Sequence, residues 1–294
     1  MPTTPSPDPD HDRGLAADLE ALASQRRRGA LRWLGGAGAL ALTGAGGLAL
    51  LGGCGGGGSD EASTAGSSSS SSTTTTSGNG TTCAAIPEET AGPYPGDGSN
   101  NANGSLANAL ALSGIVRQDI RSSIAGATGT ATGVPLAVTL RLVDSDASCA
   151  DLAGYAVYLW HCDALGRYSM YSSGVTGENY LRGVQVSDSA GELSFVTVFP
   201  GCYPGRMPHI HFEVYRDANT ATSWSNKLLT SQLALPVAAC EAVYATGGYP
   251  GSTANLAALS FASDNVFSDG VTLQLAELSG NPADGYVATL QVGF

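Results

Sequence analysis

The chain has only four histidines, and two of them, His209 and His211, stand two residues apart in the strand-like segment HIHFEVY, 209–215. Successive side chains of a β-strand point to opposite faces, so the two imidazoles share one face with Glu213, and the apolar residues between them share the other. The apolar face belongs in a core, and the other face could offer both imidazoles to one cation. Taken alone, such a pair is more typical of histidines that make structural hydrogen bonds.

Two tyrosines can join this histidine pair. Tyr203 stands immediately before a Pro-Gly turn that can fold it back toward the histidines. Tyr168 follows an Asp-x-x-Gly turn at 163–166, shortly after the apolar segment 155–160. Two phenols and two imidazoles make a hard, anionic set of N and O donors, and phenolates offset the charge of a trivalent ion better than neutral ligands do. The set therefore favours ferric iron over zinc or copper(I).

Short strand patterns recur from residue 83 to the end, and Gly, Asp, Ser and Pro clusters separate them. The predicted strands are 138–143, 155–160, 192–199, 209–215, 271–278 and 286–294. One segment, 235–245, has the pattern of a helix. We therefore predict that residues 83–294 form one all-β domain, a single β-sandwich with long loops.

The first 54 residues have the pattern of an export signal of the twin-arginine type. Arg26, Arg27 and Arg28 precede an apolar run at 33–51, and the run leads to Leu51-Gly-Gly-Cys54, which resembles a lipobox. This predicts an exported protein, periplasmic or at the cell surface, that is attached to the membrane through a lipidated Cys54. A transmembrane anchor, or cleavage elsewhere with Cys54 left free, are the alternatives.

Residues 55–82 are almost entirely Gly, Ser and Thr, which predicts a flexible linker because few side chains there can drive burial. The net charge of −12 belongs to the part beyond the signal, where eight basic residues face twenty acidic ones. A nucleic-acid partner is excluded on this ground, since binding phosphates requires a basic face.

Five cysteines follow the signal: Cys83, Cys149, Cys162, Cys202 and Cys240. Most should pair in an oxidising compartment. Cys149 and Cys162 flank the strand at 155–160 and are therefore too far apart to bond to each other. For Cys202 we expect a disulfide, with Cys162 or Cys240 as its partner.

The segments GENYLRGVQVSDSAGELSFVTVFPGCYPGRMPHIHFEV and GYAVYLWHCDALGRYS resemble the intradiol ring-cleavage dioxygenases, a family of non-haem Fe(III) enzymes that includes protocatechuate 3,4-dioxygenases and catechol 1,2-dioxygenases. EETAGPYPGDGSN near residue 90 and DGYVATLQVGF at the C-terminus are similar to secreted members. The resemblance covers residues 86–294 apart from the stretch 216–270. Two tyrosines, a PG-x-Y turn, HIHF and LRG-x-Q in this order make a specific combination.

The resemblance implies that Tyr168, Tyr203, His209 and His211 are the iron ligands and that Tyr203 is the axial ligand that leaves when substrate binds. It also implies that a catechol binds Fe(III) through both oxygens and that O2 attacks the ring. The expected product is a cis,cis-muconate-type diacid, formed by cleavage between the two hydroxyl-bearing carbons.

Arg206 lies three residues from both Tyr203 and His209, where longer family members have two arginines on a loop that is shortened here. We expect its guanidinium to stabilise charge on the substrate ring, and the alternative is an arginine that pairs with a loop carboxylate. His161 is expected to be a structural hydrogen-bonding residue, and Tyr171 and Tyr180 to form pocket wall or core. Arg182 and Gly183 are expected to have structural roles, with Gly183 in a backbone conformation that is unfavourable for other residues.

Two further functions stay open: a non-catalytic exported β-sandwich binding module with a vestigial metal site, and a zinc or copper hydrolase that uses His209 and His211. Intact Tyr168 and Tyr203 argue against the first. The second lacks a nearby carboxylate of the H-E-x-x-H kind. With Arg206 as the one evident clamp for a carboxylate, we expect neutral catechols or hydroxyquinols as substrates rather than protocatechuate. The sequence leaves homo-oligomer formation open.

Overall fold

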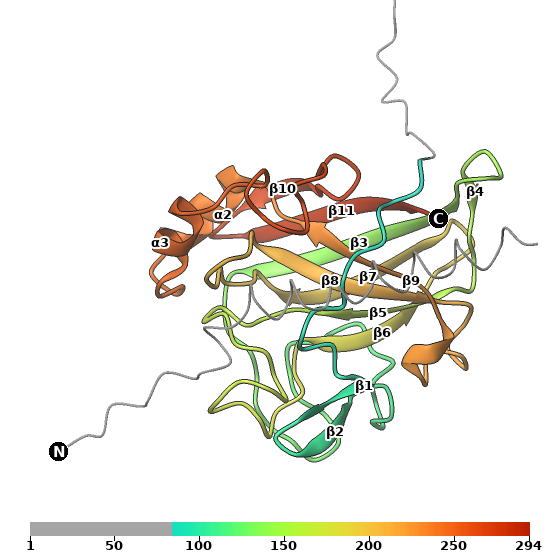
Figure 1. Ribbon diagram of the computed structural model, residues 1–294, viewed down its shortest axis with the longest axis horizontal. Helices are drawn as coiled ribbons and strands as arrows, with labels where there is room; N and C mark the ends of the chain where they lie inside the picture. Colours follow the sequence, from blue (N-terminus) through green and yellow to red (C-terminus); the bar gives the residue numbers. More distant parts are fainter. Residues whose placement is uncertain (1–83) are drawn as a thin grey trace, which may run out of the picture. The chain divides into compact units, whose positions relative to one another are not determined.

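The computed structural model describes residues 84–294 (Figure 1). The predicted export signal at 1–54, the linker at 55–82 and Cys83 lie outside the described residues, so these predictions stay untested. Between residues 84 and 294, no helix is long and apolar enough to cross a membrane.

The first of two main sheets is built around β3 (Pro135–Asp144). β11 (Gly285–Gly293) pairs with it in parallel, and β10 (Glu277–Asn281) is antiparallel to β11. β3 also pairs antiparallel with two other strands. Residues 135–141 of β3 pair with β7 (Glu192–Val198), and residues 143–144 pair with the short β4 (Ala150–Asp151). In Figure 1 the C-terminus lies at the end of β11.

The second sheet is antiparallel and has the order β6 (Arg182–Val186), β5 (Ala156–Trp160), β8 (His209–Tyr215) and β9 (Lys227–Ala234). Its register matters for the site. His211 lies opposite Trp160 of β5 on one side and opposite Gln232 of β9 on the other.

The two sheets pack face to face through the apolar residues of alternating positions. Ile210, Phe212 and Val214 of β8 belong to the same buried cluster as residues of β3, β7 and β11 such as Leu140 and Phe195. The predicted all-β sandwich is therefore confirmed, and the strand alternation predicted for 209–215 holds.

The outer face of the second sheet is also buried. Tyr158 and Trp160 of β5, Tyr215 of β8 and the two predicted tyrosine ligands, Tyr168 and Tyr203, form a separate cluster there. Long loops cover this face, and they include a small hairpin of β1 (Asp97–Ala102) and β2 (Ser105–Asn108), which lies at the bottom of Figure 1. Every residue of β8 is consequently buried.

Within residues 84–294, three short helices complete the fold: the 3-10 helix η2 (Trp224–Asn226), α2 (Val237–Tyr244) and α3 (Ser252–Ala257). The helix predicted at 235–245 is confirmed as α2. The strand predicted at 271–278 is wrong over most of its length, because 272–274 form a turn, Leu275 makes only an isolated parallel bridge to Ala234, and β10 begins at Glu277. Its apolar residues pack from this turn onto the core instead.

Gly183 is needed for space rather than for backbone conformation, so that expectation is corrected. It has no positive φ, whereas its neighbour Leu181 has a φ of 56°. A Cβ on Gly183 would lie 2.5 Å from Ile120 Cγ2 and 3.3 Å from Arg117 O, because the 115–120 segment runs alongside β6 and bridges to it in parallel at Val184. Arg182 is architectural as expected, since its buried guanidinium donates to the carbonyls of Tyr94 and Pro95.

Truncating the core face of β8 tests this packing. Phe212→Ala is expected to lower the free energy of unfolding by about 3–5 kcal/mol, because it removes a fully buried ring between the sheets. Urea denaturation of the variant and the wild type measures the loss. Val287→Ala on β11, where the side chain is 45% exposed, is the control and should cost less than about 0.5 kcal/mol. Equal losses in the two variants would contradict the assignment of Phe212 to the core.

Candidate metal centre

The four predicted ligand side chains meet at one point on the outer face of the second sheet. Tyr168 lies in the loop after β5, Tyr203 in the loop after β7, and both histidines lie in β8. Tyr168 Oη is 3.5 Å from Tyr203 Oη, Tyr203 Oη is 3.2 Å from His209 Nε2, and His209 Nε2 is 3.0 Å from His211 Nε2. All four side chains are buried.

The imidazole of His209 is in the tautomer that a metal ligand needs. Its Nδ1 lies 2.6 Å from the carbonyl of Met207, and because a carbonyl only accepts, Nδ1 carries the proton. Nε2 therefore presents a lone pair toward the other three donors. Burial lowers the pKa of both His209 and His211 well below the usual range, and the charge of Arg206 lowers that of His209 further. Both imidazoles are accordingly neutral, the form that binds metals.

The donor set fits a single ion. Atoms held about 2 Å from a common centre lie roughly 3 Å apart, which agrees with the three separations above. No three or more His, Cys, Asp or Glu side chains among residues 84–294 gather to hold a metal. A metal at this point would therefore rely on the two phenols as well as the two imidazoles, and a mixed set with anionic oxygens fits ferric iron.

Aromatic neighbours fix the rings. The imidazole of His211 stacks on Trp160 with centroids 4.9 Å apart and planes 4° apart, as the register of β5 and β8 requires. Tyr94 packs against the ring of Tyr168 at 5.0 Å and against Tyr171 at 5.3 Å. These contacts hold the ligand rings in place without adding charge.

Asp163 joins the two tyrosine loops. Its side chain accepts hydrogen bonds from two backbone N–H groups of the turn before Tyr168 and so closes that turn. Its carbonyl accepts a hydrogen bond from Gly201 N, 3.0 Å away, in the loop that leads to Tyr203. The loops approach so closely that a Cβ on Gly201 would lie 2.7 Å from the carbonyl oxygen of Ala164. The Asp-x-x-Gly turn read from the sequence thus positions both phenols.

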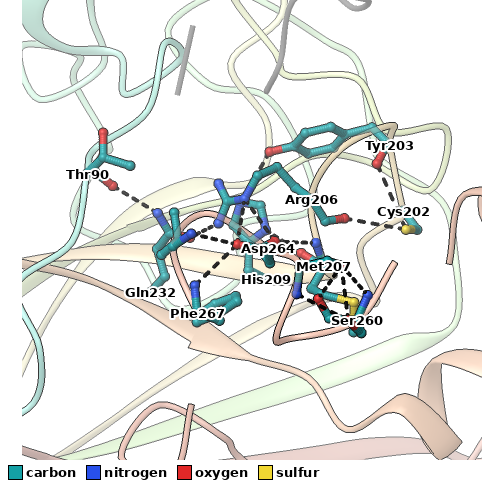
Figure 2. Close-up of polar contacts among 12 residues, drawn as sticks. Thr90, Cys202, Tyr203, Arg206, Met207, His209, Gln232, Ser260, Asp264 and Phe267 are labelled. Atoms are coloured by element: carbon teal, nitrogen blue, oxygen red, sulfur yellow. Dashed lines mark hydrogen bonds and ion pairs between the residues drawn. The ribbon is translucent and has the colours of Figure 1, made fainter. Parts of the chain in front are cut away.

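Arg206 is fully buried beside the centre and is paired with a loop carboxylate, that of Asp264, at 3.1 Å. This pairing is the alternative raised from the sequence. It does not exclude a catalytic role, because the guanidinium also reaches past Asp264 to Gln232, which lies opposite the predicted ligand His211. Arg206 Nη2 donates to Gln232 Oε1 at 2.6 Å (Figure 2). Its Cζ lies 5.8 Å from the ring centre of Phe267.

Gln232 and Asp264 are site residues that the sequence analysis missed. Gln232 lies opposite His211 and also donates to the Thr90 carbonyl at 2.9 Å, which ties the N-terminal segment of the domain to the site. Its amide stands between Ser231 and Leu233 in the buried part of β9 (KLLTSQLA), and this was the one feature of the sequence that could have marked Gln232 as a site residue. Asp264 had no signal, because it lies in an irregular stretch without a motif.

The secondary candidates behave as expected. His161 is a structural residue, with Nδ1 2.8 Å from the Cys162 carbonyl and Nε2 2.7 Å from Thr197 Oγ1, and its pKa falls to about 4 through burial. Tyr180 donates to Asp163, and Tyr171 donates to Asn100. Neither tyrosine enters the donor cluster.

The disulfide expected for Cys202 is wrong. Cys162, Cys202 and Cys240 are free and buried, and only Cys149 among the described cysteines is disulfide-bonded. Each free thiol lies near a separate carbonyl, for instance Cys202 near that of Arg206 at 3.6 Å. Burial raises the thiol pKa of Cys202 to about 12, so it stays protonated and unreactive beside the centre. The prediction that Cys149 and Cys162 do not bond to each other is confirmed.

Comparison with protein families finds a match of residues 116–225 to the C-terminal dioxygenase family model, described as "Dioxygenase". The matched range contains all four donor residues and Arg206. Comparison with curated proteins finds no significant match. The resemblance to intradiol dioxygenases that the sequence indicates is therefore confirmed for this central part of the chain.

Comparison with solved structures finds similar chains, and the first of these shows the same fold. An intradiol ring-cleavage dioxygenase from Tetranychus urticae is 24% identical, with 60% of this chain and 85% of that chain covered and a TM-score of 0.50. The dioxygenase domain of a carbohydrate-binding fusion protein from Streptomyces sp. SirexAA-E is 23% identical, with coverages of 71% and 97% and a TM-score of 0.43. A hydroxyquinol 1,2-dioxygenase from Pseudomonas putida DLL-E4 is 17% identical, with coverages of 66% and 67% and a TM-score of 0.38.

Gly201→Ala tests the contact between the tyrosine loops. The new methyl group would press on the backbone of Ala164 and Gly166, so we expect a loss of about 1–3 kcal/mol in unfolding free energy and weaker retention of iron. Denaturation and the iron content after dialysis against a chelator measure the two effects. Gly177→Ala, at an exposed position where a Cβ meets nothing within 4 Å, is the control. Unchanged stability and iron content in Gly201→Ala would show that the loops can separate freely.

Glu89 gives a prediction for pH. It is buried and accepts from Gln274 at 3.2 Å, and burial, with the nearby charge of Asp269, raises its pKa from 4.5 to about 7. The folded state thus keeps a proton that the unfolded chain has lost, so this contribution to stability is complete below pH 4.5 and is lost as the pH rises through about 7. In urea denaturation at pH 5 and pH 8, Glu89→Gln should become more stable relative to wild type at the higher pH. A difference that is constant across this range would contradict the raised pKa.

Proposed function

We propose that this chain is a ferric, intradiol-type dioxygenase that cleaves a catechol-type ring between its two hydroxyl-bearing carbons with O2 and releases a cis,cis-muconate-type diacid. The observation that carries the proposal is the meeting of Tyr168, Tyr203, His209 and His211 at consecutive separations of 3.0–3.5 Å. The family match over 116–225 supports it, because that range includes all four residues.

Each side chain then has a definite task. Both histidines and both tyrosines would hold Fe(III), which when bound lowers the pKa values of the catechol hydroxyls and makes the ring reactive toward O2. Tyr203 Oη would accept one catechol proton as the substrate enters. The Pro-Gly turn that follows Tyr203, with Gly205 at a φ of 89°, gives its loop the bend that carries the phenol to the centre.

Arg206 supplies a fixed positive charge next to the reacting ring. Its guanidinium is held between Asp264 and Gln232, so it does not need to reorganise as charge develops on the substrate. Preorganised donors of this kind stabilise a transition state more than mobile ones do. The surrounding apolar and aromatic residues exclude water and strengthen this interaction.

The proposed substrates are catechols without a carboxylate. Arg206 and Arg182 are buried close to the donor cluster, and both are engaged: Arg206 by Asp264, and Arg182 by the carbonyls of the 94–95 segment and by Ser169. A substrate carboxylate would have to displace one of these partners. Neutral catechols or hydroxyquinols avoid that cost.

Export to the periplasm or cell surface, with a lipid anchor at Cys54, forms part of the proposal. The disulfide at Cys149 supports it, because structural disulfides persist in oxidising compartments. Folding before export would also let iron bind inside the cell, where the supply of competing metals is controlled.

The first experiment is a visible absorption spectrum, with iron content, of protein produced without its leader, before and after anaerobic addition of catechol. We expect a broad red-brown band from tyrosinate bound to Fe(III), which shifts with catechol, and consumption of O2 once air is admitted. Tyr168→Phe should weaken and shift the band, because Tyr203 is then the one phenol left in the donor set, and should lose at least about 100-fold in kcat, since one anionic ligand is gone. Tyr155→Phe, whose ring packs against Phe294 on the far side of the fold, is the control.

A colourless protein that stays colourless when ferric iron is supplied would overturn the proposal. The same protein binding a ligand without turnover would then favour the exported binding module.

A further inference from the structure

We infer that Asp264 is the positioning residue of this site: it orients the Arg206 guanidinium toward the substrate and, through Met207, fixes the tautomer and ring orientation of His209. The inference rests on the proposed function for its catalytic consequence. Asp264 lies outside both the matched range 116–225 and the segments that carry the sequence resemblance.

The carboxylate of Asp264 accepts hydrogen bonds from two directions. From the site it accepts Arg206 Nε, at 3.1 Å and 3.3 Å from its two oxygens, and Met207 N at 2.7 Å. From its own loop it accepts the backbone N–H groups of Val266 at 2.9 Å and Phe267 at 3.3 Å. Figure 2 shows Asp264 at the centre of these contacts, and its side chain is fully buried.

These contacts fix the plane of the guanidinium. Asp264 holds Nε on one edge, Gln232 holds Nη2 on another, and the ring of Phe267 lies beside Cζ. The Phe267 backbone is itself held by Asp264, so one carboxylate sets both the charge and the ring beside it. A side chain with several rotatable bonds is thereby restricted to one orientation before substrate arrives.

The second branch reaches a predicted iron ligand. Asp264 holds the N–H of Met207, and the carbonyl of the same residue accepts the Nδ1 proton of His209 at 2.6 Å. The hydrogen bond to the distal ring nitrogen selects the tautomer and ring orientation of a ligating histidine. Asp264 thus connects the cation of the site to the imidazole whose Nε2 faces the other donors.

A purely structural role is the competing explanation, because Asp264 also closes the turn at 264–267. Breaking a buried ion pair from one side destabilises a protein, so reduced stability alone does not separate the two roles. Coupling to Arg206 in catalysis and a change in the His209 tautomer do separate them, since a turn-closing residue would alter neither selectively.

The test compares Asp264→Asn with Asp269→Asn, an exposed carboxyl five residues along the same loop, in iron-loaded full-domain protein. With catechol as substrate, we expect Asp264→Asn to keep its tyrosinate band and lose about 10- to 100-fold in kcat, with a smaller change in KM. In the Arg206→Gln background the same substitution should have a much smaller effect on kcat, because the branch through Arg206 is then already lost and only the branch through Met207 remains. Asp269→Asn should match wild type.

A second measurement does not depend on turnover. Histidine ¹⁵N NMR of metal-free protein should show His209 protonated at Nδ1 only in the wild type and in Asp269→Asn. Asp264→Asn should show a mixture of tautomers, because the Met207 N–H has lost its charged acceptor and the backbone of this residue is held less firmly.

Wild-type kcat together with a single His209 tautomer in folded Asp264→Asn would overturn the inference, as would an equally large kcat loss in the Arg206→Gln background. A wild type without the tyrosinate band or turnover would refute the proposed function instead, and the NMR comparison would still test the link from Asp264 to His209.

Discussion

The alternation of side chains along β8 is the constraint on which the site depends. Placing Ile210, Phe212 and Val214 between the sheets forces His209 and His211 onto the opposite face, where loops bury them as well. Buried imidazoles need partners, and burial keeps these two neutral. The fold supplies the phenol of Tyr203 and the carbonyl of Met207 as partners of His209, and Nε2 of His211 lies 3.0 Å from Nε2 of His209.

The loops that supply those partners are held by a few buried carboxylates and small residues. Asp163 closes the turn before one tyrosine and receives the backbone of the loop before the other, and Gly201 leaves the space for that approach. Asp264 likewise accepts hydrogen bonds from the side chain of Arg206 and the backbone N–H of Met207. Each carboxylate joins segments that are distant in sequence, so the geometry of the centre is set by loop-to-loop contacts on a rigid strand.

Charge is balanced within the site. The positive charge of Arg206 is matched by Asp264, and Glu89 nearby has a pKa raised to about 7. Such an environment suits a cation that binds anionic ligands, because the positive charge of Arg206 is already compensated and repels the cation little. It also favours an uncharged aromatic over one that brings a carboxylate into a space without an unpaired cation.

The sequence by itself determined the all-β class and the strand at 209–215 with its two faces, because period-two alternation acts over few residues. It also predicted that the side chains of Tyr168, Tyr203, His209 and His211 come together, because local turns direct the two tyrosines. Only the tertiary structure decided the partners of Arg206, the free state of Cys202, the steric need for Gly183 and the turn in place of a strand at 272–274. Each of these depends on which distant segments pack together. Asp264 is 58 residues from Arg206, and no local pattern encodes a contact of that span.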